Sequence, residues 1–202
     1  AYERKKQQRF QDHRKRFIQV KPQIEAGQQL HALNDAGKAY LNQYIDLERN
    51  GSTSLQRLQE WLGDELAASA LIGFSKLLER TDLPTAKQIA ETHAEGKTWN
   101  SEIAMICGVS ELVRTGKGLG GVRPEMLQAT LAAWWEFPDS FNEVGPDVQP
   151  QLEAAVFTSP EAITDFLRTT MEPAIAAGLD RVSGLHQLPR DPRYHSIAGT
   201  LS

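Results

Sequence analysis

The feature that most constrains this chain is its succession of apolar residues at spacings of three and four, broken at intervals by glycine and proline. Residues three or four apart lie on the same face of an α-helix, so each run is typical of an amphipathic helix. One run predicts a helix up to about Leu47 and consists of Leu30, Leu33, Ala36, Gly37, Tyr40, Leu41 and Tyr44. Because such runs follow one another along the chain, the sequence predicts an all-α protein.

The segment from Asp64 to Glu79 has a different pattern, because its apolar residues cover most of the helix circumference. A helix that is apolar on all sides is buried on all sides, so we expect this one at the centre of the protein. Helix starts are predicted near residues 64, 85, 101, 124 and 160. They give two-helix steps of about forty residues, in the range of HEAT-like arrays. We therefore expect an irregular α-solenoid, a helical-repeat-like array of about eight helices.

Several residues predict where helices begin and end. Ser54 is the expected N-cap of one helix, and Gly63 is expected to end it. Pro124 opens a helix, and Ser159 followed by Pro160 combines a hydroxyl cap with a proline at the first helical position. Pro173 is expected to bend or interrupt the helix that follows.

The paired tryptophans Trp134 and Trp135 occur at helical spacing with Leu127 and Leu131. This spacing favours packing between helices over stacking on a ligand. Residues 139–150, which contain proline and glycine, are predicted to form an irregular exposed loop.

We expect residues 1–202 to form a single helical domain that is part of a larger protein. The chain starts at Ala1, and residues 195–199 near its end read like the opening of another helix. The expected segments are a basic helical arm (1–24), a helical core (25–115), a glycine-rich linker (116–123) and further helices (124–202).

Cysteine and histidine usage argues against disulfides and metal sites. Cys107 is the single cysteine and lies in an apolar helical stripe, so we expect a buried, unreactive thiol. The five histidines show no paired metal spacing, and no cofactor is predicted. A reducing compartment and the lack of an apolar run of roughly 18 residues favour a cytoplasmic protein that does not enter the membrane.

The stretch from Gly116 to Gly121 satisfies the pattern G-x-G-x-x-G, but its context argues against dinucleotide binding. The glycines should follow a strand, whereas residues 110–114 read as the end of a helix. The candidate acid Glu136 lies beside Phe137 rather than at the end of a second strand. A phosphate loop is excluded as well, because Lys117 is followed by glycine. We interpret the stretch as an interhelical linker.

The best candidate for acid–base chemistry is the group formed by Glu91, His93 and Glu95. On one helix only the two glutamates share a face, and His93 points toward the apolar stripe. No catalytic residue is therefore predicted. An enzyme whose site is assembled from residues distant in sequence stays open as a third class of function.

The N-terminal arm is strongly basic. Residues 1–21 carry eight Lys or Arg residues against two acids, a net charge of +6, whereas the rest carries 14 against 24, a net charge of −10. Apolar residues at helical intervals predict a docking stripe with a solvated basic remainder, and they are Tyr2, Phe10, His13, Phe17 and Ile24. The residues predicted to contact nucleic acid or a partner are Arg9, Arg14, Lys15 and Arg16.

Several short sequence segments, taken in their order along the chain, resemble the helical region that follows the NTPase module in large bacterial NACHT-type proteins of the STAND class. These segments are Arg16-Phe17, Tyr40-Leu41, the segment from Arg57 to Leu66, Asp82-Leu83-Pro84-Thr85, and His93-Ala94-Glu95-Gly96-Lys97. The resemblance covers most of the chain and concerns residues that pack helices together, not catalytic residues. It implies a sensor or relay segment, in a family with many links to antiphage defence, and it transfers no nucleotide-binding residue to this sequence.

We therefore expect a non-catalytic interaction, sensor or relay module that contacts a protein partner or other domains of its parent chain. The alternative is a helical module that binds nucleic acid through the basic arm.

Overall fold

The computed structural model describes residues 2–44, 47, 52–137, 144–185 and 194. Over these ranges the chain is all-helical, with no strand, which confirms the predicted class. Ten helices are described, against the expected eight or so: α1 Tyr2–Gln19, α2 Lys21–Glu25, α3 Leu30–Tyr40, α4 Ser54–Leu62, α5 Asp64–Leu77, α6 Ala86–Ala94, α7 Glu102–Arg114, α8 Pro124–Glu136, α9 Val148–Val156 and α10 Pro160–Ala176. The solenoid arrangement stays a prediction.

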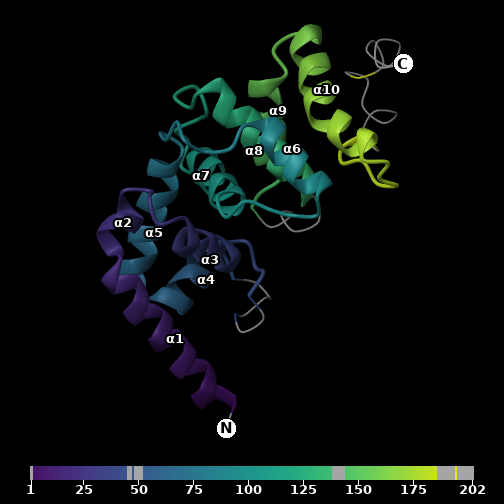
Figure 1. The fold of residues 1–202 in the computed structure, drawn as a ribbon. Coiled ribbons are helices and arrows are strands. Elements are labelled where there is room, and N and C mark those ends of the chain that lie inside the picture. The colour runs from purple at the N-terminus through teal and green to yellow at the C-terminus, as the bar shows by residue number, and fades with distance from the viewer. Residues whose placement is uncertain (1, 45–46, 48–51, 138–143, 186–193, 195–202) are drawn as a thin grey trace.

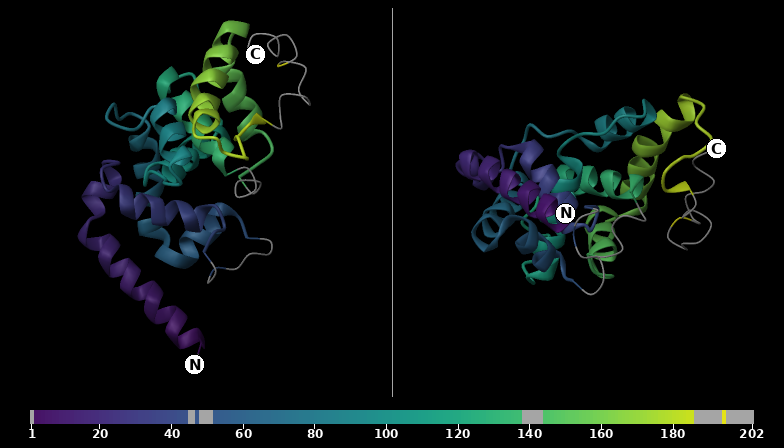
Figure 2. Two further views of the ribbon diagram at one scale, coloured as in Figure 1. Left: turned by 45° about the vertical axis from the view of Figure 1, so that its right-hand side comes forward. Right: turned by 90° about the horizontal axis from the view of Figure 1, so that it is seen from below.

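The helices form two groups that meet at α7. Helices α1 to α5 lie at one end of the molecule and α6 to α10 at the other, and α1 projects away from the rest (Figures 1 and 2). Helix α7 packs against α3 and α5 in the first group and against α8 and α9 in the second. Its side chains from Ala104 to Glu111 are all buried. Helix α7 is thus the central element of the fold.

The prediction that residues 64–79 form the fully buried helix is wrong. Helix α5 lies in the core with Phe74 and Leu77, but Ile72 is 49% exposed and Leu71 is only half-buried. The largest neighbours of α5 are α7 and α2, and they leave the side of Ile72 open. The apolar pattern around this helix therefore led to a prediction of more complete burial than the structure shows.

Two helices begin with a complete capping box. In α4 the N-cap is Thr53, not Ser54: its hydroxyl accepts a hydrogen bond from the Gln56 N–H at 3.2 Å, and the Gln56 side chain accepts one from the Thr53 N–H at 2.8 Å. Thr85 and Gln88 form the same arrangement in α6. Each box satisfies two backbone donors that a helix start otherwise leaves unpaired.

Helix α3 ends at Tyr40, seven residues before the predicted end at Leu47. Asn42 adopts a left-handed conformation with φ of 59°, which ends the helix. The Gln43 N–H then bonds back to the Lys38 carbonyl at 2.8 Å. Leu47 is nevertheless buried, so its side chain belongs to the core as its apolar character suggests.

The prolines at helix starts were predicted correctly, whereas the interruption expected at Pro173 and the loop expected as far as Pro150 were not. Pro124 and Pro160 open α8 and α10, and Ser159 caps α10. Pro173 does not interrupt α10, which runs through it to Ala176. Pro150 lies within the first turn of α9, which begins at Val148. The loop predicted at 139–150 therefore ends before residue 148.

The tryptophans and the glycine-rich stretch behave as predicted. Trp134 and Trp135 are buried, and Trp135 packs edge-on against Phe166 with ring centroids 5.0 Å apart. The chain from Gly116 to Val122 joins α7 to α8 and follows a helix rather than a strand. This context confirms that the stretch is an interhelical connection.

The helix opening predicted at residues 195–199 lies outside the described residues, and so do residues 139–143 of the predicted loop. Within the described residues, no helix has the length and apolar character required to cross a membrane.

Candidate functional site

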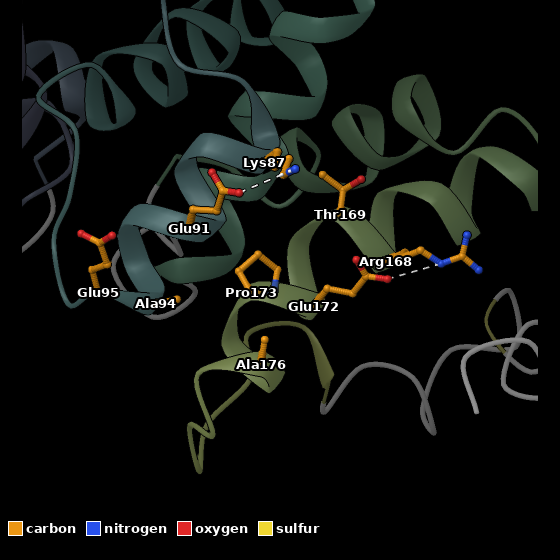
Figure 3. A pocket seen from close by; sticks show the side chains of 9 residues that line it. All are labelled: Lys87, Glu91, Ala94, Glu95, Arg168, Thr169, Glu172, Pro173 and Ala176. Carbon is orange, nitrogen blue, oxygen red and sulfur yellow. Dashed lines mark ion pairs between the residues drawn. The ribbon is translucent and has the colours of Figure 1, made fainter.

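Helices α6 and α10 pack against each other, and an open groove of about 520 Å³ runs between them on the surface (Figure 3). One wall comes from α6 and the other from the second half of α10, and the lining side chains are Lys87, Glu91, Ala94, Glu95, Arg168, Thr169, Glu172, Pro173 and Ala176. The two helices are far apart in sequence, so the groove is created only by the tertiary fold. It is the candidate functional site of this chain.

The charges of the groove pair along each wall. Lys87 Nζ lies 3.7 Å from Glu91, and Arg168 Nε lies 3.6 Å from Glu172, each pair on a single helix four residues apart (Figure 3). Exposed pairs of this kind contribute only a few tenths of a kcal/mol, about 0.3–0.5. These side chains can therefore exchange their present partners for those of another molecule at little cost.

The groove is also lined by small apolar residues and by a proline within α10. Ala94 and Ala176 are small, and Pro173 lies on the α10 wall (Figure 3). Proline has no N–H, so the carbonyl of Thr169 cannot receive the usual hydrogen bond from position 173. The helical hydrogen-bond pattern of α10 therefore lacks one donor at a position where the helix lines the groove.

The C-terminal end of α10 carries exposed apolar side chains next to this groove. Ile175 is 60% exposed, and Leu179 just beyond the helix end is also exposed. Gly178 has φ of +67°, and the Leu179 N–H bonds to the Ala174 carbonyl at 3.0 Å, which fixes how the chain leaves the helix. Exposed large apolar residues beside a polar-rimmed groove are typical of an interaction surface.

The opposite face of α6 holds a cluster of His93 and two carboxylates. His93 Nε2 lies 2.6 Å from Oε2 of Glu102 on α7, and its Nδ1 lies 3.7 Å from Oε2 of Glu136 on α8. Glu102 is 1% exposed and also accepts a hydrogen bond from the Trp99 N–H at 2.6 Å. Ser183 donates to Glu136 at 2.8 Å. The cluster thereby joins α6, α7, α8 and the segment after α10.

The environment of His93 favours its charged form. Burial of the ring lowers its pKa, but the hydrogen bond to Glu102 and the negative charges of Glu102 and Glu136 together outweigh it, so the pKa of His93 is raised above the usual value. In the charged form both ring nitrogens are donors, which suits a histidine that lies between two carboxylates.

The His93 cluster is better suited to holding helices together than to catalysis. His93 does not line the groove between α6 and α10. The sequence-based reading of Glu91, His93 and Glu95 is correct in its geometry, since both glutamates line the groove and His93 points inward. Its partners were missed because Glu102 and Glu136 lie on other helices.

A second buried network links α3 to α7. The Tyr40 hydroxyl donates to Glu111 at 2.6 Å, and Arg114 contacts the same carboxylate at 2.8 and 2.7 Å. Burial and the neighbouring Glu111 raise the pKa of Tyr40 well above its usual range. Cys107 is fully buried one turn away, and burial raises the pKa of its thiol, as expected for an unreactive cysteine.

Of the four basic residues predicted as contacts, Arg14 has a structural role. Its Nε donates to the Trp61 carbonyl at 2.9 Å and its guanidinium also donates to the Glu60 carbonyl at 2.7 Å, at the C-terminal end of α4. Arg14 is therefore half-buried and not part of the solvated side of α1. Arg9, Lys15 and Arg16 are exposed, and Lys15 lies 3.8 Å from Asp12.

The docking stripe of α1 was predicted correctly except at its start. Phe10 and Phe17 are buried, and His13 and Phe17 pack on Trp61 with ring centroids 5.1 and 5.3 Å away. Tyr2 is 59% exposed, because the first turns of α1 project beyond α4 (Figure 1).

Among the described residues, no group of three or more His, Cys, Asp or Glu side chains is placed to hold a metal ion. Comparisons of the chain with protein-family models, with curated proteins and with solved structures gave no match.

Proposed function

We propose that this chain is a non-catalytic helical module that binds a protein partner and relays that binding to other parts of a larger protein. The resemblance to bacterial NACHT-type proteins of the STAND class motivates this assignment, which includes a sensor role in antiphage defence. A cytoplasmic location is part of the proposal, because the cysteine is a buried thiol without a disulfide partner.

The observation that carries the proposal is the groove between α6 and α10. Its walls carry exposed ion pairs between near neighbours in the sequence, and the small side chains of Ala94 and Ala176 lie among them. The Thr169 carbonyl lacks its usual helical donor, because position 173 is proline. A groove with these properties suits a helix or an extended segment of another protein, which supplies apolar anchors and polar rim contacts.

The position of α6 supports a relay. One face of α6 forms the groove wall, and its other face carries His93, which contacts Glu102 on α7 and Glu136 on α8. A partner that shifts α6 would also change these contacts. Helix α7 in turn packs against both helix groups, so a change there can reach α3 and α5.

The proposal can be tested by filling the groove. Ala176 lines it, whereas the adjacent Ala177 is also exposed but does not line it. We would express the full-length parent chain in its native cells as the natural sequence, as Ala176→Trp and as Ala177→Trp, and identify the proteins captured by each. We expect a specific partner to be captured by the natural protein and by Ala177→Trp, and to be lost with Ala176→Trp.

Equal capture of the same partners by both tryptophan variants would contradict a role for the groove. Thermal unfolding of the two variants serves as the folding control, since both substitutions add an exposed side chain near the end of α10.

A second candidate function is nucleic-acid binding by α1, and one observation favours it. Arg14 contacts α4, whereas an exposed side of the projecting helix carries Lys5, Arg9 and Arg16. Lys5, Arg9 and Arg16 are four and seven residues apart, so they follow one side of the helix over about 16 Å. Such a row can contact successive phosphates.

Salt dependence separates this candidate from the first. Binding of duplex DNA through this row should weaken steeply with salt, with a logarithmic slope of about −0.9 for each phosphate contact. Changing Lys5, Arg9 and Arg16 together to Gln should flatten that slope. Binding that is absent, or that keeps its slope in the triple variant, would exclude the row as a nucleic-acid contact.

A further inference from the structure

A second open cavity, of about 510 Å³, lies where α5 and α7 end and α8 begins. The connection from Gly116 to Val122 forms one side of it and contributes Lys117, Gly118 and Gly121, and Arg123 follows at the start of α8. The groove between α6 and α10 shares no lining residue with this cavity. Its chemistry can therefore be considered separately from the proposed function.

The cavity holds two cations whose donors are incompletely used. Lys117 forms no ion pair with any residue that the structure describes. Arg123 donates to the Arg80 carbonyl, and its buried Nε has no hydrogen-bond partner within the described chain. The acid on the wall, Glu79, is already bound by Lys76 Nζ, at 2.9 and 3.0 Å. An anionic ligand in the open cavity would supply acceptors for the Lys117 ammonium and for the Arg123 guanidinium, both of which line it.

The backbone around the cavity is compatible with an anion. The N–H groups of Gly116 and Lys117 donate at 3.0 Å to carbonyls of Val113 and Leu112, so the negative end of α7 is already capped. A Cβ atom added at Gly118 or Gly121 would meet nothing within 4 Å. The cavity therefore reaches the main chain at both glycines, where a ligand can approach closely.

The remaining wall is apolar. Leu78 at the end of α5, Leu112 on α7 and Val122 beside α8 line this side. Leu78 is buried, and the other two are half-buried. A ligand confined to a charged group would leave this surface in contact with water, so the cavity suits a molecule with an anionic end and an apolar body.

We propose that this cavity binds a small phosphate monoester that carries an apolar group. The phosphate lies between Lys117 and Arg123, where its charge and several acceptor oxygens match an ammonium and a guanidinium. The apolar group packs on Leu78, Leu112 and Val122. The volume is in the range of small-molecule sites, roughly 300–1,000 Å³.

Phenyl phosphate is a suitable probe, because it combines one phosphate monoester with one ring. We would titrate it into the natural chain by isothermal calorimetry at low salt, with inorganic phosphate and phenol as comparison compounds. We expect saturable binding of phenyl phosphate, at least tenfold weaker binding of inorganic phosphate, and no measurable binding of phenol.

Two adjacent glycines give a matched pair of variants. Gly121 lines the cavity and Gly120 does not, and a Cβ at either position meets no atom within 4 Å. Neither has a positive φ, so both accept a side chain without backbone strain. Gly121→Leu should fill the cavity and weaken phenyl phosphate binding at least tenfold, whereas Gly120→Leu should bind like the natural chain. Lys117→Gln should also lose at least tenfold in affinity.

The proposal is overturned if the natural chain does not bind phenyl phosphate, or if Gly121→Leu and Lys117→Gln bind as tightly as Gly120→Leu. Equal affinity for inorganic phosphate would overturn the assignment of an apolar group on the ligand. Circular dichroism of each variant checks that the helical fold is retained, and none of these outcomes bears on partner capture by the groove.

Discussion

The two helix groups stabilise buried charge in different ways. In the group from α1 to α5, arginine side chains donate to backbone carbonyls: Arg14 to Trp61 and Arg57 to Tyr40 at 2.8 Å. In the group from α6 to α10, His93 lies between carboxylates. Arginine stays charged at every accessible pH, whereas histidine titrates close to neutrality. The arginine–carbonyl links of the first group should therefore not change with pH, whereas the His93 link of the second group should.

The two kinds of link also differ in their distance from the candidate partner site. The arginine links lie inside the first group and are used by its fold. The His93 link lies behind the candidate groove, on the one helix that forms both.

The largest effect is expected from Gly73→Ala in α5. Alanine normally stabilises a helix relative to glycine by about 1 kcal/mol. At this position the added Cβ would lie 2.3 Å from the backbone oxygen of Ile24, which cannot move without displacing α2. We expect a loss of about 3 kcal/mol in the free energy of unfolding, measured with urea. A gain in stability would show that α2 and α5 are not in such close contact.

The next effect is expected from His93→Gln and depends on pH. Because the pKa of His93 is raised in the folded protein, its contribution is fully present below the unfolded pKa of about 6.5. That contribution is lost as the pH rises through the folded pKa. We expect the variant to be about 2 kcal/mol less stable at acidic pH, with a difference that shrinks as the pH is raised.

Urea unfolding at a series of pH values measures this difference. A constant difference across the series would contradict a charged His93 in the folded protein.

A smaller loss is expected from Arg14→Gln, about 1.5 kcal/mol, because two charge-assisted hydrogen bonds at the end of α4 are removed. Unlike the His93→Gln loss, it should be the same at acidic and at alkaline pH. The same urea series tests both variants side by side. A loss that changes with pH as strongly as that of His93→Gln would remove the distinction between the two groups.

The smallest effect is expected when Lys15 and Arg16 are both changed to Gln. Both side chains are exposed, so stability should change by less than about 0.5 kcal/mol. Thermal unfolding of the double variant is sufficient for this test. A larger loss would mean that the exposed flank of α1 is packed against another part of the chain.

Periodicity predicted the helices and much of the core, because it reports which residues share a face. It found Phe10, Phe17 and the inward direction of His93 correctly. It placed the end of α3 too late because the left-handed conformation of Asn42, which ends the helix, interrupts no apolar pattern. It also chose Ser54 over Thr53 as a cap, since either hydroxyl satisfies the rule and backbone geometry decides.

The candidate site was much less predictable. The groove requires α6 and α10 to lie side by side, and neither helix carries a signal for the other. Arg14 was predicted to be a surface contact residue. Its acceptors are backbone carbonyls 46 and 47 positions away, and no sequence pattern links them to Arg14. The sequence did offer one signal, the predicted inward position of His93. A buried histidine needs hydrogen-bonding partners, so polar side chains were to be expected around it. The structure shows that these partners are Glu102 and Glu136.

Hydrogen–deuterium exchange of the full-length protein with and without its captured partner tests both the groove and the relay through α6. We predict slower exchange at residues 87–95 and 168–176, which form the groove, together with a change in α7 and α8 around Glu102 and Glu136. Slower exchange confined to α1, with residues 87–95 unaffected, would contradict the groove as the partner site and the relay through α6.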